Sequence, residues 1–257
     1  MPAAYDELLG PALFAPFARD VAGRCADLRP GSVLELAAGT GILTAELVAR
    51  LPGVPVTATD LNPEMVEHGS RRVPEASWRP ADAQSLPFPD GAFDLVVCQF
   101  GVMFFPDRPG AFAEAARVLS PGGRLLVTTW DVVGTSPFPA ALADALAAVL
   151  PEDPPDFVAR VPHGYTDPDR IRADLSAGGL AGTVERVVLR GTAPSARAVA
   201  EGFCRGTPLL FALRERGDVE ALTDAVAEEM TARLGDGPVT GDLAAFVVTA
   251  TPQPATR

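Results

Sequence analysis

The fold of this chain is decided by the stretch Val33-Leu34-Glu35-Leu36-Ala37-Ala38-Gly39-Thr40-Gly41. It reads as a short buried strand over residues 32–36 that runs into a glycine turn, and a helix is expected from about 42 to 50. Glycine permits positive φ and lets the backbone approach a ligand without a Cβ in the way. The N-terminus of the following helix offers unpaired N–H groups and a partial positive charge. The stretch therefore predicts the nucleotide-binding crevice of a doubly wound α/β domain.

The spacing of glycines and acids indicates which nucleotide fits. A dinucleotide-binding turn reads G-x-G-x-x-G, with an acidic residue about 20 residues on. Here Glu35 is followed after three residues by Gly39 and then by Gly41, with Ala37 where a first glycine is expected. Asp60 ends a second predicted strand over 54–59 and is placed to accept hydrogen bonds from ribose hydroxyls.

The carboxylate beside the glycine turn narrows the choice further. A pyrophosphate is an anion, and Glu35 at the strand end would repel it, whereas a ligand with an ammonium group would be attracted. S-adenosylmethionine (SAM) carries adenosine, an ammonium and a sulfonium, and it has no phosphate. The acid-rich crevice therefore favours SAM over a dinucleotide.

Four further segments follow the glycine turn in a familiar order. Residues 59–65 read TDLNPEM, 81–88 read ADAQSLPF, 93–100 read FDLVVCQF and 119–127 read LSPGGRLLV. Together with ELAAGTG at 35–41, over roughly residues 30–130, they resemble the motifs of the class I SAM-dependent methyltransferases. The chain is most similar to the small-molecule methyltransferases of the ubiquinone and menaquinone biosynthesis type.

The resemblance implies a cofactor-binding set. The amino-acid part of SAM would lie beside the glycine turn and strand 4, the ribose on the acidic turn and the adenine against the third segment. The residues implied are Glu35, Ala37, Gly39, Gly41, Asp60, Leu61, Met65, Asp82, Ala83, Gln99 and Phe100. S-adenosylhomocysteine (SAH) would be the product.

The acceptor is expected at the carboxyl end of strand 4. Met103, Phe104 and Phe105 follow that strand and would wall an apolar acceptor, although a hydrophobic cluster under the next helix is an equal reading. Tyr5 belongs to an N-terminal helical segment that would act as a lid, or else would pack on the sheet edge. Gln99 and the residues after it do not form the Asn/Asp-Pro-Pro-aromatic motif of DNA-adenine methyltransferases, which disfavours that substrate.

A general base is required only for a protonated nucleophile such as an alcohol or phenol. His163, in a loop, is the first candidate, although a structural loop histidine is the commoner reading; Asp131 just beyond strand 5 is the second and Tyr165 the third. His68 is expected to be solvated. The histidines and cysteines lack metal-ligand spacing, so no metal is expected.

Composition limits the partners. The net charge of −12 argues against nucleic acid and anionic membrane surfaces. Three scattered cysteines fit reduced thiols in a cytoplasmic protein. The N-terminal residues lack a basic region and an apolar run, so we expect no signal peptide, and no stretch is long and apolar enough for a membrane span. Abundant Ala, Gly, Pro and Arg without Lys suggest a bacterial source, and a monomer or homodimer is expected.

The alternation of predicted strands and helices gives the architecture. Strands at 32–36, 54–59, 76–80, 93–98 and 124–130 alternate with helices at 42–51, 63–72 and 110–119, which predicts a parallel sheet. Helices are expected at 139–150, 167–177, 195–205, 207–216 and 219–234, and strands at 183–189 and 243–250. We expect one Rossmann-like domain over 1–257. It comprises a lid over 1–30 that Pro11 and Pro16 break into short helices, a core over 31–130, and roof helices over 131–257 with a C-terminal hairpin. About seven strands are expected, the last antiparallel, with a helical insertion before it.

These features predict a SAM-dependent methyltransferase that acts on a small, largely apolar acceptor at O, N or C, and bacterial secondary metabolism is the context that we expect for it. A SAM-binding cyclase or rearrangement catalyst that transfers no methyl is the alternative, because function depends on the site rather than on the fold. A SAM-sensing binding protein is a third reading. A nicotinamide dehydrogenase is the weakest, because the glycine spacing differs.

Overall fold

The structure is a computed structural model that describes residues 5–253. The chain forms two compact units, each assembled from separate segments. The core unit comprises Ala18–Thr129, Tyr165–Val187 and the chain from Ala245; the helical unit comprises the chain up to Phe17, Trp130–Gly164 and Val188–Ala244. The first four residues of the expected lid, 1–4, lie outside the described residues, as do 254–257.

The strands form a seven-stranded sheet in the order β3-β2-β1-β4-β5-β7-β6. The pairs β3–β2, β2–β1, β1–β4 and β4–β5 are parallel, and β7 is antiparallel, which confirms the predicted Rossmann-like α/β sheet with an antiparallel last strand. The strands are β1 (Val33–Glu35), β2 (Val56–Asp60), β3 (Ser77–Pro80), β4 (Phe93–Gln99), β5 (Leu119–Trp130), β6 (Leu180–Ala193) and β7 (Val239–Pro252).

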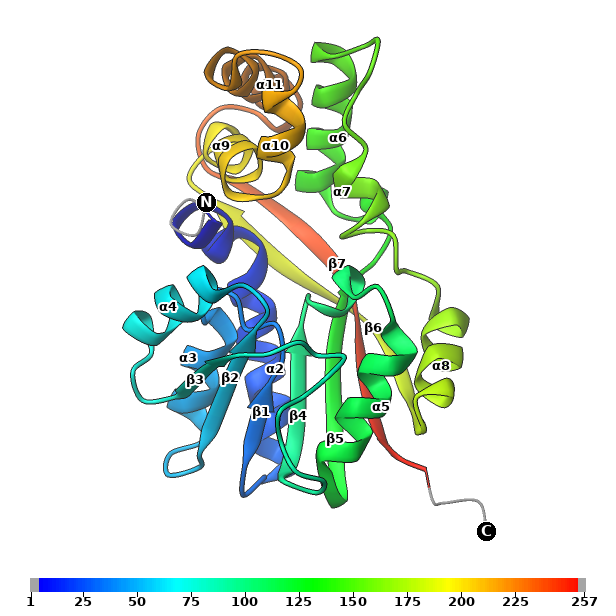
Figure 1. The fold of residues 1–257 in the computed structure, drawn as a ribbon. Coiled ribbons are helices and arrows are strands. Elements are labelled where there is room, and N and C mark those ends of the chain that lie inside the picture. The colour runs from blue at the N-terminus through cyan, green and yellow to red at the C-terminus, as the bar shows by residue number, and fades with distance from the viewer. Residues whose placement is uncertain (1–4, 254–257) are drawn as a thin grey trace. The chain divides into compact units, whose positions relative to one another are not determined.

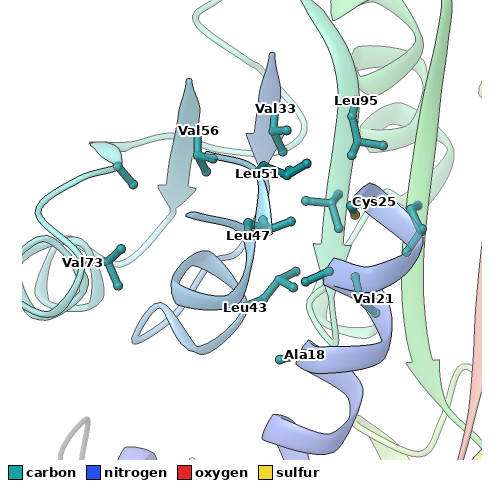
Figure 2. Packing of buried hydrophobic residues seen from close by; sticks show 14 of the residues in the cluster. Ala18, Val21, Cys25, Val33, Leu43, Leu47, Leu51, Val56, Val73 and Leu95 are labelled. Atoms are coloured by element: carbon teal, nitrogen blue, oxygen red, sulfur yellow. The ribbon is translucent and has the colours of Figure 1, made fainter. Parts of the chain in front are cut away.

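Within the core unit, helices pack on the strands through a buried apolar cluster. Ala18, Val21 and Cys25 of α2 meet leucines of α3 and the strand residues Val33 and Val56 (Figure 2). The helices of this unit are α2 (Ala15–Leu28), α3 (Ile42–Arg50), α4 (Pro63–Arg72), α5 (Arg108–Val118) and α8 (Pro168–Ala177). The short 3₁₀ helix η2 (Val102–Phe104) follows β4, and α5 packs against α8.

The helical unit contains the predicted insertion. Three helices lie between β6 and β7, namely α9 (Ala196–Gly206), α10 (Leu209–Arg214) and α11 (Val219–Leu234), and Figure 1 shows them beside one another. Helix α11 packs against α9 and α6 (Pro137–Val149), and α9 packs against the π-helix η1 (Tyr5–Phe14). The 3₁₀ helix η3 (Val133–Thr135) and the short α7 (Phe157–Arg160) complete this unit and were not predicted.

The N-terminal helices differ from the expectation in one respect. We expected both Pro11 and Pro16 to break this segment: Pro16 does mark a boundary, because it lies in the first turn of the 14-residue α2, whereas Pro11 does not end a helix. The first helical turn has no intrahelical partner for its N–H groups, so proline is tolerated there. Pro11 lies inside η1, whose wider turns differ from those of an α-helix. Among residues 5–253, no helix is both long enough and apolar enough to cross a membrane.

Candidate functional site

The parallel register brings the carboxyl ends of β1, β2 and β4 to one edge of the core sheet. Glu35 at the end of β1 pairs with Ala58 of β2 and with Val97 of β4. Asp60 and Gln99 each lie two residues further along their own strand. The polar side chains that the sequence places after three separate strands therefore converge, as expected for a ligand site in an open α/β sheet.

The glycine turn is held open beside Asp60. Gly39 has φ of 57° and Gly41 has φ of 83°, a left-handed conformation that side chains rarely adopt. The Gly39 N–H donates to Asp60 Oδ2 over 2.8 Å. A Cβ added to Gly39 would meet no atom within 4 Å, so space remains above the turn. Ala37, where a first glycine was expected, also has positive φ, at 50°.

Glu35 is buried, with 2% of its surface exposed. Its Oε2 accepts a hydrogen bond of 2.6 Å from Thr44 Oγ1 on α3, and its backbone oxygen accepts one of 2.8 Å from Thr59 Oγ1. Burial raises the pKa of Glu35 to about 8, with a further rise from the neighbouring charge of Asp60. This carboxyl is therefore largely protonated at neutral pH, and a cation beside it would favour its ionised form.

Asp60 forms the second acidic position. Oδ1 accepts a hydrogen bond of 2.9 Å from the N–H of Asn62, which itself caps α4, while burial raises the pKa of Asp60. Each carboxylate oxygen can accept more than one hydrogen bond, so capacity remains for ligand hydroxyls. Leu61, next in the chain, is 71% exposed, and Met65 lies half-buried on α4. An exposed leucine beside an acidic turn is suited to contact a flat apolar ring.

The turn after β3 presents Asp82 and Ala83. Asp82 Oδ1 accepts hydrogen bonds from the backbone N and side-chain Nε2 of Gln84, at 2.8 and 3.2 Å. The Gln84 Oε1 in turn accepts one of 2.9 Å from the N–H of Asp107, which caps α5. The Ala81 N–H donates to the Asp60 backbone oxygen at 3.0 Å, which links this turn to β2.

At the end of β4, Gln99 is partly exposed and Phe100 is buried with φ of 54°. The Phe100 N–H donates to both oxygens of Thr128 at 3.1 Å. A Cβ on the next residue, Gly101, would lie 2.5 Å from Ala37 Cβ, so the segment after β4 starts directly against the glycine turn.

The three residues expected to wall the acceptor have different environments. Met103 is buried at 2% exposure, Phe105 is half-buried and Phe104 is 48% exposed. Arg108 Nη2 donates to the Met103 oxygen at 2.8 Å. Phe104 is therefore the member of this set that presents its ring most openly.

The candidate base His163 lies in the helical unit, together with Asp131. His163 Nδ1 lies 2.6 Å from the Asp131 backbone oxygen, so this nitrogen carries the hydrogen of the neutral ring and Nε2 carries the lone pair. Burial lowers the pKa of His163. The Trp130 ring stacks on His163 with centroids 6.0 Å apart, and Phe14 lies tilted against Trp130, also with centroids 6.0 Å apart. The neighbouring Tyr5 stacks on Phe14 at 4.8 Å.

The third candidate base, Tyr165, lies in the core unit. Its hydroxyl donates to Asp174 Oδ2 at 3.0 Å, and Asp174 also accepts a hydrogen bond of 2.9 Å from Arg170. Burial and the Asp174 charge raise the pKa of Tyr165. This ring also carries the Arg108 guanidinium, 4.4 Å from the ring centroid.

Several supporting residues were not anticipated from the sequence. Thr44, Gln84, Arg108 and Arg117 act on predicted site segments through side-chain hydrogen bonds. Thr44 stands three residues after Gly41, a position from which a first-turn hydroxyl can reach back to the strand end, so the sequence did contain a signal for it. Among residues 5–253, no group of three or more His, Cys, Asp or Glu side chains is arranged to hold a metal ion.

Residues 34–127 match the family model described as "Methyltransferase domain". Over 102 residues the chain is 45% identical to the demethylmenaquinone methyltransferase of Thermus thermophilus, which covers 38% of this chain and 46% of that protein. The chain thus spans about half the length of this curated relative.

Solved structures share the fold over most of the chain. The YcgJ protein of Bacillus subtilis superposes with a TM-score of 0.59 at 22% identity, covering 92% of this chain and 99% of that one. The [4+2]-cyclase SpnF superposes with a TM-score of 0.54 at 21% identity, covering 90% and 82%. Residues 34–127 are thus similar to a methyltransferase domain, and the sheet that they help to form has the fold of these solved structures.

Proposed function

We propose that this chain transfers a methyl group from SAM to a small, largely apolar acceptor. The observation that carries the proposal is the open glycine turn beside two carboxyl groups, the buried Glu35 and the half-buried Asp60, within the segment that matches a methyltransferase domain. Similarity to curated relatives such as the demethylmenaquinone methyltransferase supports an acceptor of quinone type. A role in secondary metabolism belongs to the same proposal.

The residues present fit SAM. The space above Gly39 leaves room for a ligand backbone. The charge of Asp60 disfavours a phosphate beside the turn, and the buried Glu35 carboxyl would ionise beside a cationic ligand. Asp60 would accept from ribose hydroxyls, Leu61 and Met65 would contact the adenine, and Asp82 with the Ala83 N–H would bind the adenine edge. Ala37, Gly41, Gln99 and Phe100 complete the set around the amino-acid part.

SAM supplies a methyl carbon that its sulfonium has already activated toward displacement. The protein must hold the nucleophile in line with this carbon and exclude water, which can account for most of the rate enhancement. Phe104 offers an exposed apolar surface for the acceptor, and Met103 and Phe105 of the same segment are further proposed substrate contacts. Tyr5 is a separate proposed substrate contact within the helical unit.

Where the nucleophile is a hydroxyl, His163 is the proposed general base. Its Nε2 lone pair can take the acceptor proton, because Nδ1 is fixed on the Asp131 carbonyl and the lowered pKa keeps the ring neutral. Asp131 and Tyr165 rank behind it; the Tyr165 hydroxyl already donates to Asp174. Replacing His163 by Asn should lower kcat at least tenfold for a hydroxyl acceptor. Near-normal turnover would remove His163 from the mechanism.

Product analysis with methyl-labelled SAM tests the proposed function. The acceptors are a short-chain demethylmenaquinone in its reduced form and a panel of small phenols, amines and enols. Label in the product supports methyl transfer. An unlabelled rearranged product indicates a cyclase, and a tight SAH complex without turnover indicates a sensor. Calorimetric binding of NAD but of neither SAM nor SAH would overturn the cofactor assignment.

A further inference from the structure

The segment after β4 is fixed at both of its ends. At its start, Gly101 lies against Ala37 of the glycine turn, since a Cβ on Gly101 would approach Ala37 Cβ to 2.5 Å. At its far end, Arg108 Nε and Nη2 donate to the backbone oxygens of Val102 and Met103, at 3.3 and 2.8 Å. Between these two anchors the backbone forms the single 3₁₀ turn η2, with Phe104 exposed on it.

The Arg108 guanidinium is itself held in place. It lies over the Tyr165 ring at 4.4 Å from the centroid, a cation–π contact. The Tyr165 backbone oxygen accepts a hydrogen bond of 3.0 Å from Thr129 Oγ1 of β5, and its hydroxyl is bound to the buried Asp174 of α8. Arg108 therefore couples η2 to two elements of the core unit that take no part in the proposed cofactor contacts.

The backbone at the start of α5 is also bonded to the proposed adenine turn. The Asp107 N–H donates to Gln84 Oε1, and Gln84 also binds Asp82, the proposed adenine contact. The residue pair 107–108 thus joins the proposed adenine turn to the exposed Phe104. A displacement of Arg108 would move η2 relative to the glycine turn while leaving Glu35 and Asp60 in place.

We propose that Arg108 is a positioning residue that sets the place of Phe104, and with it the acceptor, relative to the methyl donor. This inference rests on the proposed function and adds a residue to it. An arginine is suited to the task because its planar fork reaches two carbonyl oxygens while its face stacks on an aromatic ring. A lysine keeps the charge but offers a single compact donor group, so it cannot hold both carbonyls in the same way.

The test compares Arg108→Lys with Arg172→Lys, whose arginine forms an exposed ion pair with Asp169 in the same unit. Arg108→Lys should raise hydrogen exchange at the Phe104 and Phe105 amides about tenfold, because these N–H groups bond to Gly101 and Val102 within η2. It should leave the calorimetric Kd for SAH within about twofold, and kcat should fall about tenfold with little change in KM for SAM. Arg172→Lys should change none of these quantities.

Tyr165→Leu provides the second variant, since it removes the ring beneath Arg108. It should raise exchange at the same two amides, even if Arg108→Lys proves unstable. Unchanged amide exchange and unchanged kcat in both variants would overturn the inference, as would a loss of SAH affinity equal to the loss of kcat. If the wild-type protein binds SAH but transfers no labelled methyl group to any acceptor, the proposed function is contradicted. Hydrogen exchange at the two amides would still test whether Arg108 holds η2 in place.

Discussion

The backbone N–H of Gly39 donates to Asp60 Oδ2 over 2.8 Å, so the acidic end of β2 holds the glycine turn of β1 directly. The other oxygen of the same carboxylate holds the Asn62 N–H at 2.9 Å. Asp60 thus orders the turn on which the proposed ligand rests before it offers any hydrogen bond to that ligand. One side chain performs both tasks because a carboxylate has more acceptor positions than these two bonds use.

Asp60→Asn should therefore weaken SAH binding strongly. The amide keeps one acceptor oxygen and places an NH₂ group against an N–H donor, so one of the two backbone bonds is lost together with the charge. We expect Kd for SAH to rise about 10- to 100-fold by calorimetry, in line with about 1.5–3 kcal/mol for a hydrogen bond to a charged group. Asp27→Asn, at an exposed position of α2, is the control and should bind normally. Equal affinities in the two variants would contradict the role of Asp60.

Glu35 should make folding less favourable as the pH rises. The unfolded chain releases this proton near the ordinary pKa of 4.5, whereas the folded protein holds it until about pH 8. Between these values the folded state binds the extra proton, so the free energy of unfolding falls with increasing pH. The decrease is fully developed above the folded-state pKa and absent below pH 4.5.

Glu35→Gln should remove this dependence, because the amide cannot ionise yet its oxygen can still accept from Thr44. Urea unfolding should show that, between pH 5 and pH 9, the free energy of unfolding of the variant rises by about 2–4 kcal/mol relative to that of the wild type. This estimate takes about 1.4 kcal/mol for each unit by which the pKa is raised. Glu46→Gln on α3, at a half-buried position, is the matched control. If the difference in the free energy of unfolding between Glu35→Gln and the wild type is the same at every pH, the pKa of Glu35 is not raised in the folded protein.

The sheet could be predicted because its signals are local. Strand-plus-glycine patterns, Pro63 at the first turn of α4 and the run of buried residues in β4 act over a few residues, and the observed elements agree within a few positions. The strands β5, β6 and β7 run longer than predicted. The extra stretch of β5 begins at Leu119, which pairs with Phe93 of β4, and Gly122 and Gly123 lie in the irregular stretch before Arg124 pairs with Leu95. Local propensity does not reveal such a cross-strand pair.

The supporting contacts of the site were harder to predict because they join distant residues. Gln84 meets Asp107 across 23 positions, and Arg108 meets Tyr165 through the packing of α5 on α8. No periodicity or motif spacing encodes such a meeting. Exposure was equally inaccessible: Met103 and Phe104 are neighbours of similar hydrophobicity, yet one is buried and the other is not.

Gly101 and Ala37 should show strong energetic coupling. A methyl group on Gly101 would lie 2.5 Å from Ala37 Cβ and 2.8 Å from Cys98 Sγ, so Gly101→Ala should destabilise the fold by about 1–3 kcal/mol. Ala37→Gly removes one of these two contacts and also relieves the positive φ at that residue. The double variant should be more stable than the sum of the single changes by at least about 0.5 kcal/mol.

Urea unfolding of the four proteins in this cycle supplies the measurement. Gly23→Ala in α2, where an added Cβ meets no atom within 4 Å, is the control and should stabilise by about 0.5–1 kcal/mol. Additive effects of Gly101→Ala and Ala37→Gly would mean that the segment after β4 does not press on the glycine turn.

Arg117 should control cofactor affinity from a distance. On α5 it donates to the backbone oxygens of Leu86 and Phe88 at 2.9 and 2.8 Å and to the carboxylates of Glu114 and Asp90. The Leu86 N–H in turn donates to Glu114 Oε2 at 2.7 Å. These bonds fix the chain that leaves the proposed adenine turn.

A lysine cannot reach both carbonyls and both carboxylates, so Arg117→Lys should raise the Kd for SAH about three- to tenfold and increase amide exchange across 84–90. Arg71→Lys, whose arginine forms an exposed pair with Glu67 on α4, is the matched control. If both variants bind SAH equally well, the adenine turn keeps its shape without Arg117.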